Sequence, residues 1–153
     1  MTKTTHRFIE WNARLVLGIQ LIDSQHEKLV HLTNNLHVAC LKNREIAKRY
    51  FIKTAREAVR YADYHFSTEE QMMIFLGYPD FRIHKKEHEG FIKEILRQTF
   101  MFAEHKNLVP NRFVQYLREW ILSHIAVCDK DFANYIFSYE NCDKLEVLFI
   151  NSA

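Results

Sequence analysis

Histidine and carboxylate residues recur at helical spacing along this chain, and they are the residues best suited to chemistry. His65 and Glu69 are four residues apart, and so are His84 and His88. Residues four apart lie on one face of a helix, so each pair would present its side chains together. Neutral imidazole binds iron, copper or zinc well, and a carboxylate in a helical bundle can join two metal ions. The spacing therefore indicates a candidate metal site.

Three further residues of the same types extend this set. His26 precedes the first pair, and His124 and Asp129 follow the second. Each alone has an ordinary interpretation, because a single histidine on an apolar helix face is more often a core or rim residue. Seven such groups buried together without partners would be costly, and metal is the simplest way to satisfy them. The candidate ligands are His26, His65, Glu69, His84, His88, His124 and Asp129.

Four amphipathic helices are the elements that would position these residues. Apolar side chains recur at helical period over about 21–41, 44–76, 81–104 and 112–128. Only 3 Gly and 2 Pro occur, which favours long helices, and Gly77-Tyr78-Pro79-Asp80 forms a turn in which Asp80 is expected to cap the next helix. Short polar loops join the helices. The pattern predicts an all-α protein, an up-down-up-down four-helix bundle.

The length of 153 residues suits one domain with a real core. We expect a single domain over 1–153, with an N-terminal arm at 1–18, the bundle at about 21–128, and a tail at 129–153. Phe8, Ile9 and Trp11 are the apolar anchors expected for the arm. The tail carries Leu145, Val147, Leu148 and Phe149 among other apolar residues, so we expect a short helix there that packs on the bundle.

The positions of the candidate ligands within the helices agree with a single site. In an antiparallel bundle, the start of the first and third helices and the end of the second and fourth lie at the same end of the molecule. That end carries His26, the pair His65 and Glu69, the pair His84 and His88, and His124. Asp129 follows His124 by five residues, which a straight α-helix would turn about 140° away. We therefore expect the last helix to distort or end near 127–129.

Composition excludes several other classes of protein. The formal net charge is +2 without long Lys/Arg blocks, so nucleic acid is not an expected partner. The N-terminal region has no long apolar run, so we expect neither a signal peptide nor a membrane span. Three distant cysteines without a Cys-x-x-Cys pair fit a reducing cytoplasm. We expect a cytoplasmic monomer.

The seven residues in this order resemble the hemerythrin family, in particular its single-domain bacterial members. The family order is His, His-x-x-x-Glu, His-x-x-x-His and His-x-x-x-x-Asp, and every position is filled here. The flanking segments Ile22-Asp23-Ser24-Gln25, Tyr78-Pro79 and Trp120-x-x-x-His124-Ile125 match as well. The similarity covers about residues 8–135.

The resemblance implies a non-haem di-iron centre that binds O2 reversibly and holds it as hydroperoxide, for oxygen storage, delivery or sensing. One iron would take His84, His88 and His124, and the other His26 and His65. Glu69 and Asp129 would bridge them, together with an oxo or hydroxo group. The two-histidine iron would keep the open position for O2. NO or small anions such as azide are further ligands that the resemblance implies.

The resemblance also implies an apolar pocket beside the open position. Glu70 follows the ligand Glu69 and is expected either to support a ligand from outside the metal site or to lie at the surface. Four other histidines match no ligand position: His6, His31, His37 and His105. The residues that map to the pocket are also plausible as plain core residues. They are Leu29, Phe66, Trp120, Ile121 and Ile125.

Three other interpretations remain open. A di-iron oxidase or peroxidase, or a protein of nitric oxide chemistry or iron-cluster repair, would use a similar centre, although carboxylate-bridged oxidases favour Glu-rich sets with Glu-x-x-His pairs. An oxygen sensor would need an output element that the sequence does not reveal. A zinc site needs fewer ligands than seven. We therefore expect ligand binding rather than enzymatic turnover.

Overall fold

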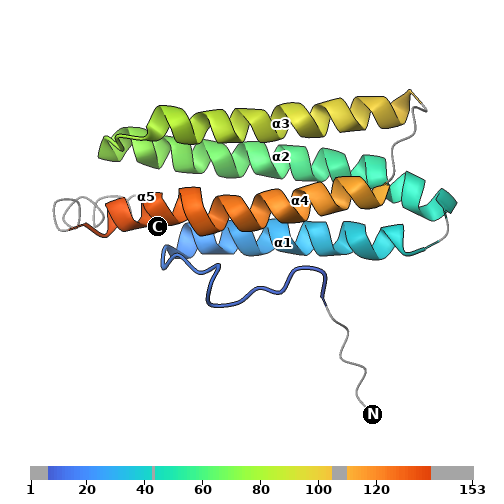
Figure 1. The fold of residues 1–153 in the computed structure, drawn as a ribbon, viewed down its shortest axis with the longest axis horizontal. Helices are drawn as coiled ribbons and strands as arrows, with labels where there is room; N and C mark the ends of the chain where they lie inside the picture. The colour runs from blue at the N-terminus through green and yellow to red at the C-terminus, as the bar shows by residue number, and fades with distance from the viewer. Residues whose placement is uncertain (1–6, 43, 105–109, 139–153) are drawn as a thin grey trace, which may run out of the picture.

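Four long helices lie side by side in the computed structural model, which describes residues 7–42, 44–104 and 110–138 (Figure 1). They are α1 (Gln20–Cys40), α2 (Arg44–Leu76), α3 (Phe81–Ala103) and α4 (Pro110–His124). Successive helices run in opposite directions, and α1 packs against both α2 and α4. The predicted all-α, up-down-up-down four-helix bundle is confirmed, with helix bounds within about two residues of those predicted except at the end of the last helix.

The helices form because their apolar faces meet in one core. In α1 the buried side chains recur at the predicted helical spacing and include Ile22, His26 and Leu29. The helix α2 ends where Gly77 adopts φ +67°, a conformation that glycine takes without strain. The expectation that Asp80 caps α3 holds for its position only. Asp80 precedes the helix, but its side chain makes no capping hydrogen bond.

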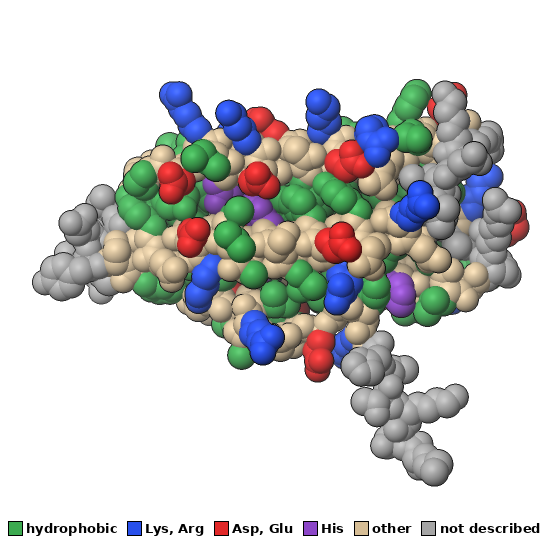
Figure 2. All heavy atoms as spheres, in the orientation of Figure 1, with side chains coloured by type: hydrophobic (Ala, Val, Ile, Leu, Met, Phe, Trp, Pro, Cys, Tyr) green, Lys and Arg blue, Asp and Glu red, His purple; other side chains and the backbone are tan. Residues whose placement is uncertain are grey.

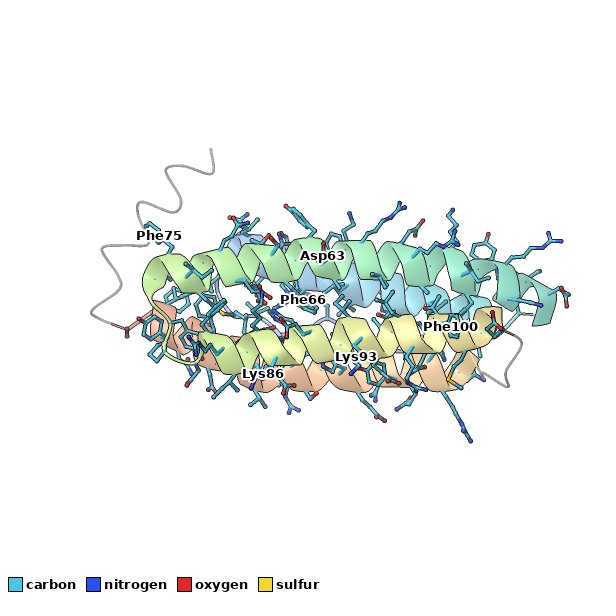
Figure 3. All side chains as sticks on the ribbon, turned by 90° about the horizontal axis from the view of Figure 1, so that it is seen from above. Asp63, Phe66, Phe75, Lys86, Lys93 and Phe100 are labelled. Atoms are coloured by element: carbon cyan, nitrogen blue, oxygen red, sulfur yellow. The ribbon has the colours of Figure 1, made fainter. Side chains whose placement is uncertain are left out.

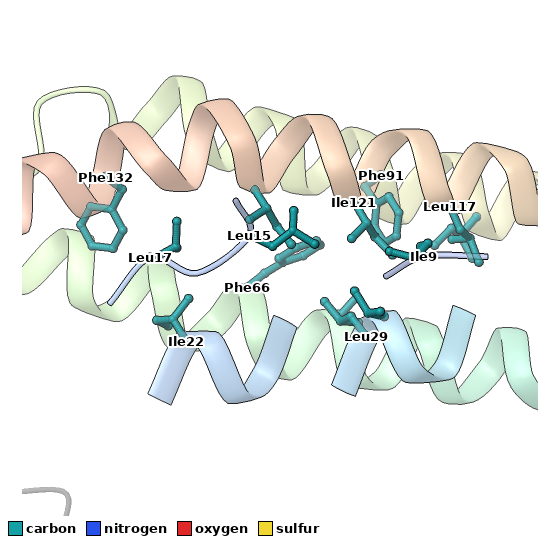
Figure 4. Close-up of a cluster of buried hydrophobic side chains, with 14 of the residues drawn as sticks. Ile9, Leu15, Leu17, Ile22, Leu29, Phe66, Phe91, Leu117, Ile121 and Phe132 are labelled. Carbon is teal, nitrogen blue, oxygen red and sulfur yellow. The ribbon is translucent and has the colours of Figure 1, made fainter. Parts of the chain in front are cut away.

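The N-terminal arm lies along the seam between α1 and α4. Asn34 of α1 binds the arm through both backbone groups of Ile9, accepting from its nitrogen at 2.8 Å and donating to its oxygen at 2.8 Å. Arg118 of α4 donates to the Phe8 carbonyl oxygen at 3.2 Å. Ile9, Leu15 and Leu17 are buried, and Figure 4 shows them among side chains of the bundle. Of the expected anchors, Ile9 is fully buried, while Phe8 and Trp11 are partly buried.

The last helix continues beyond its predicted end. After α4 the chain makes a π-helical turn, η1 (Ile125–Asp129), and goes on directly as α5 (Lys130–Ile136). Phe132 and Ile136 of α5 are buried, and the Tyr135 hydroxyl donates to the Leu76 carbonyl oxygen at 2.9 Å. The predicted tail helix is thus a continuation of α4 that packs against the α2–α3 turn. The other expected tail contacts, those of 145–149, lie outside the described residues.

None of the described helices combines the length and the apolar character that crossing a lipid bilayer requires.

Among the described residues, the end of the bundle away from the α2–α3 turn is filled by aromatic packing. Phe51 contacts Phe102 and Phe113, with ring centroids 4.4 and 4.8 Å away. Polar side chains occupy the interior at the other end.

Candidate metal centre

The seven predicted ligands meet inside the bundle at the end that carries the α2–α3 turn. The helix α1 supplies one histidine, α2 a histidine and a glutamate, α3 two histidines, and α4 with η1 a histidine and an aspartate. All are almost inaccessible to solvent, with exposed fractions of 0–4%. Histidine atoms are visible between α3 and α4 in Figure 2. The structure thus brings together His26, His65, Glu69, His84, His88, His124 and Asp129.

The five imidazoles turn the same ring atom, Nε2, toward one another and toward the carboxylates. The Nε2 atoms of His26 and His65 are 3.0 Å apart, and those of His88 and His124 are 3.1 Å apart. Neutral imidazole has one ring nitrogen with a lone pair free to bind a metal. The five Nε2 atoms converge, as the ligand atoms of a metal site do.

Asp129 faces the site because of the π-helical turn. Its Oδ1 atom lies 3.0 Å from Nε2 of His84 and 3.1 Å from Nε2 of His124, while Oδ2 lies 3.1 Å from Nε2 of His26. In a π-helix the backbone hydrogen bonds join residues five apart, which stacks His124 and Asp129 on one face. The predicted distortion near 127–129 is therefore confirmed, and the carboxylate lies between two groups of histidines.

The ligand atoms form two overlapping groups. In one, Glu69 and Asp129 join His84, His88 and His124; in the other, the same two carboxylates join His26 and His65. Within each group the ligand atoms all lie within 4.8 Å of one another. Such an arrangement suits two neighbouring metal ions that share both carboxylates.

Unpaired polar atoms provide a test of whether metal fits this site. Within the described part of the chain, no hydrogen bond of good geometry reaches either carboxylate oxygen of Glu69 or Asp129, and none reaches Nε2 of His84 or Nδ1 of His26 and His124; all of these atoms are buried. Buried polar groups are normally paired, because leaving them unpaired costs free energy. The carboxylate oxygens and the His84 Nε2 atom face the centre, where metal ions would satisfy them, so the residues present fit a metal pair.

The charges at the site also favour cations. Burial raises the pKa of Asp129, but neighbouring histidines, His124 above all, lower it well below its usual range. Burial lowers the pKa of His124, but the charge of Asp129 outweighs this and raises it to about 10. His84 behaves in the same way, with a pKa raised to about 9, whereas burial lowers that of His65 to about 4. Asp129 is therefore ionised, and metal ions bound here would take the place of the protons on His84 and His124 as the positive charges beside it.

Two of the histidines form a hydrogen bond through Nδ1, the ring nitrogen that faces away from the other ligands. Nδ1 of His65 donates to Oε1 of Gln25 at 2.8 Å, and Nδ1 of His88 donates to Oε1 of Glu70 at 3.1 Å. Such hydrogen bonds fix which nitrogen faces the metal. Glu70 was expected either next to the ligands or at the surface, and this contact places it next to a ligand. From the sequence, Gln25 was named only as part of a matching flanking segment and was given no role, because it contacts a residue 40 positions away.

Two of the expected pocket residues contact histidines of the site. The Phe66 ring stacks on His88 with centroids 3.8 Å apart, and the Trp120 ring stacks on His124 at 4.2 Å. Figure 3 shows Phe66 on the inner side of α2. Trp120 is partly buried, and the other four, Leu29, Phe66, Ile121 and Ile125, are buried members of one hydrophobic cluster.

His31 and His37 belong to neither ligand group. His31 is exposed and contacts Asn35, and His37 stacks on Phe8 with ring centroids 4.1 Å apart. His6 and His105 lie outside the described residues.

Comparison with known proteins agrees with this geometry. Residues 17–136 match the family model described as the hemerythrin HHE cation binding domain. The chain is 31% identical over 131 residues to the bacteriohemerythrin of Stenotrophomonas maltophilia, which covers 86% of this chain and 83% of that protein. It is 33% identical over 126 residues to the bacteriohemerythrin of Pseudomonas aeruginosa, covering 82% of this chain and 78% of that one. The solved structure of wild-type hemerythrin matches with a TM-score of 0.74 and 26% identity, over 84% of this chain and 98% of that chain. The chain therefore belongs to the hemerythrin family.

Proposed function

We propose that this protein binds O2 reversibly at a pair of iron ions and is not an enzyme. The observation that carries the proposal is the pair of overlapping ligand groups, which share Glu69 and Asp129. Imidazole and carboxylate together suit iron, and seven ligands exceed what one zinc ion needs. When bound, the two irons supply the coordination position and the electrons for O2 binding.

The two positions would differ in the number of protein ligands. His84, His88 and His124 would hold one iron, and His26 and His65 the other, with both carboxylates and a solvent-derived oxygen shared. The second position has one histidine fewer, which leaves it more room for a small ligand. O2 is the proposed ligand, and we expect NO and small anions such as azide to compete for the same position.

The apolar residues around the site would protect the bound ligand from water. Leu29, Ile121 and Ile125 are buried, and the rings of Phe66 and Trp120 cover two of the histidines. An apolar wall keeps water and protons away, which favours release of an unchanged ligand over its reduction. The ligand set of five histidines and two carboxylates also differs from the Glu-rich sets of di-iron oxidases.

The optical spectrum tests the proposal. Protein loaded with Fe²⁺ and reduced with dithionite is expected to develop a visible absorption band in air and to lose it when O2 is removed. The variant His65→Ala is expected to lose the band, because His65 belongs to the two-histidine group. The matched control is His31→Ala, an exposed histidine of α1 that should leave the band unchanged.

Two results would contradict the proposal. Bound iron without a band that reverses with O2, together with consumption of O2 or peroxide, would favour an oxidase or peroxidase. Failure to bind iron even after reconstitution would remove the di-iron assignment itself.

Replacing Gln25 tests how the two-histidine group is held. We expect Gln25→Leu to weaken iron binding there by roughly 10–100-fold, because His65 loses the acceptor for its Nδ1 proton. The measurement is iron retained per chain against increasing chelator. Gln20→Leu, which changes an exposed glutamine of the same helix, is the control. An unchanged chelator titration for Gln25→Leu would show that the hydrogen bond is dispensable.

A further inference from the structure

Glu70 is held between a buried histidine and a lysine at the surface. Its Oε1 atom accepts from Nδ1 of His88 at 3.1 Å, and its Oε2 atom accepts from Nζ of Lys85 at 2.8 Å. The Glu70 side chain is 17% exposed and that of Lys85 is 43% exposed, whereas His88 is 2% exposed. Both carboxylate oxygens therefore have a partner, and the three side chains link the surface to the interior.

The link opens onto a groove between α2 and α3. The groove has a volume of about 510 Å³, and Phe66 and His88 lie among its lining residues together with Glu70 and Lys85. Its rim also carries Glu89 and Lys93, which are exposed. Glu70 therefore contacts His88 on the side opposite the ligand cluster, where solvent reaches the outer end of the link.

We infer that Glu70 is a positioning residue that fixes the orientation of His88 and, through its negative charge, lowers the reduction potential of the iron pair. A carboxylate that accepts the Nδ1 proton makes the opposite nitrogen a stronger donor, which favours the more highly charged metal. Lys85 limits this effect by sharing the carboxylate charge. The inference rests on the proposed di-iron function.

The two-histidine and three-histidine groups differ in the side chain that accepts the Nδ1 proton. His65 is held by the neutral amide of Gln25, whereas His88 is held by a carboxylate. Hydrogen bonds that involve a charged partner are roughly twice as strong as neutral ones. Of these two contacts, only that of the three-histidine group adds negative charge, so Glu70 is expected to affect that iron more than its neighbour.

Charge-neutral and charge-retaining variants separate orientation from charge. Glu70→Gln keeps an acceptor for His88 but removes the charge, so the reduction potential should rise while iron content stays at the wild-type level. Glu70→Ala removes both, so iron affinity should also fall by roughly 10–100-fold. Lys85→Met removes the moderating charge, and the potential should fall.

Two control variants remove equal charges from the same groove without touching this link. Asp63→Asn and Lys93→Met change exposed residues that line the groove and should leave the potential within error. Equal shifts in the controls and the test variants would overturn the inference, because they would reflect the general field of the groove. An unchanged potential in Glu70→Gln would overturn it as well.

A measurement on metal-free protein keeps this test apart from the proposed function. Nitrogen chemical shifts of the His88 ring report which nitrogen carries the proton. Wild type should hold the proton on Nδ1, and Glu70→Ala should shift it toward Nε2, whether or not the protein binds iron. If this shift occurs but iron does not bind, the proposed function fails while the orienting role of Glu70 stands. If the ring proton is unaffected, the orienting role is overturned.

Discussion

Glu69→Gln is expected to deplete both irons from the protein, whereas His65→Ala depletes one. Glu69 belongs to both ligand groups, while His65 belongs to only one of them. The Oε2 atom of Glu69 lies 3.3 Å from Nε2 of His88 and 3.6 Å from Nε2 of His65, so it reaches both groups. Glutamine keeps the size of the side chain but removes its negative charge. Buried cations would then lack part of the charge that compensates them, which is costly.

Iron per chain, measured during a chelator titration, distinguishes the two variants. The affinity loss in Glu69→Gln should exceed the roughly 10–100-fold expected when only a hydrogen-bond partner of a ligand is removed. His65→Ala should keep close to one iron, bound by the three-histidine group. Glu57→Gln, an exposed glutamate of α2, should bind as wild type does. If Glu69→Gln kept both irons at wild-type affinity, the shared carboxylate would have no bridging role.

Spacing along the chain was sufficient to predict the architecture. Apolar residues at helical period gave the four helices, and the His65–Glu69 and His84–His88 spacings fixed which side chains share a face. These are local properties, so they do not depend on how the helices pack. Because successive helices alternate in direction, all the candidate ligands were predicted to lie at one end of the bundle, and the structure brings them together there.

Features that depend on the packing of distant segments were less accessible. The spacing of His124 and Asp129 predicted a distortion, but not that the helix would continue through a π-helical turn into α5. The contact of Gln25 with His65, from another helix, depends on how α1 and α2 are aligned lengthwise. The same holds for Glu70 with His88, across α2 and α3. No local pattern in the sequence contains this information.

The N-terminal arm shows the same limit. The anchor Ile9 was predicted from its apolar character, and it is buried. Leu15 and Leu17, also buried, were not singled out. Buried and exposed positions alternate along this extended segment, but the exposed Val16 between them is apolar too, so the sequence does not reveal the alternation. Asn34 of α1 fixes the arm through the backbone of Ile9, an interaction that only the packed structure reveals.

Metal binding is expected to raise the thermal stability of the protein substantially. Among the described residues, no well-aligned hydrogen bond reaches the buried carboxylates of Glu69 and Asp129. An ion that binds only the folded state stabilises it by about 2.7 kcal/mol when its free concentration is 100 times its dissociation constant. Two such sites would add about 5 kcal/mol, which for a chain of this size corresponds to roughly 10–20 °C in Tm.

Anaerobic thermal unfolding followed by circular dichroism, with and without Fe²⁺, measures this effect. Mg²⁺ is the control ion, since it prefers oxygen ligands and octahedral geometry and binds poorly to a histidine-rich site. Glu69→Gln is the control variant, and its Tm should respond much less to Fe²⁺ because it lacks a ligand shared by both groups. A wild-type Tm that does not change with Fe²⁺ would mean that the seven residues form an ordinary buried polar network. A rise with Fe²⁺ that is absent with Mg²⁺ and reduced in Glu69→Gln would tie the stability of this end of the bundle to the metal pair.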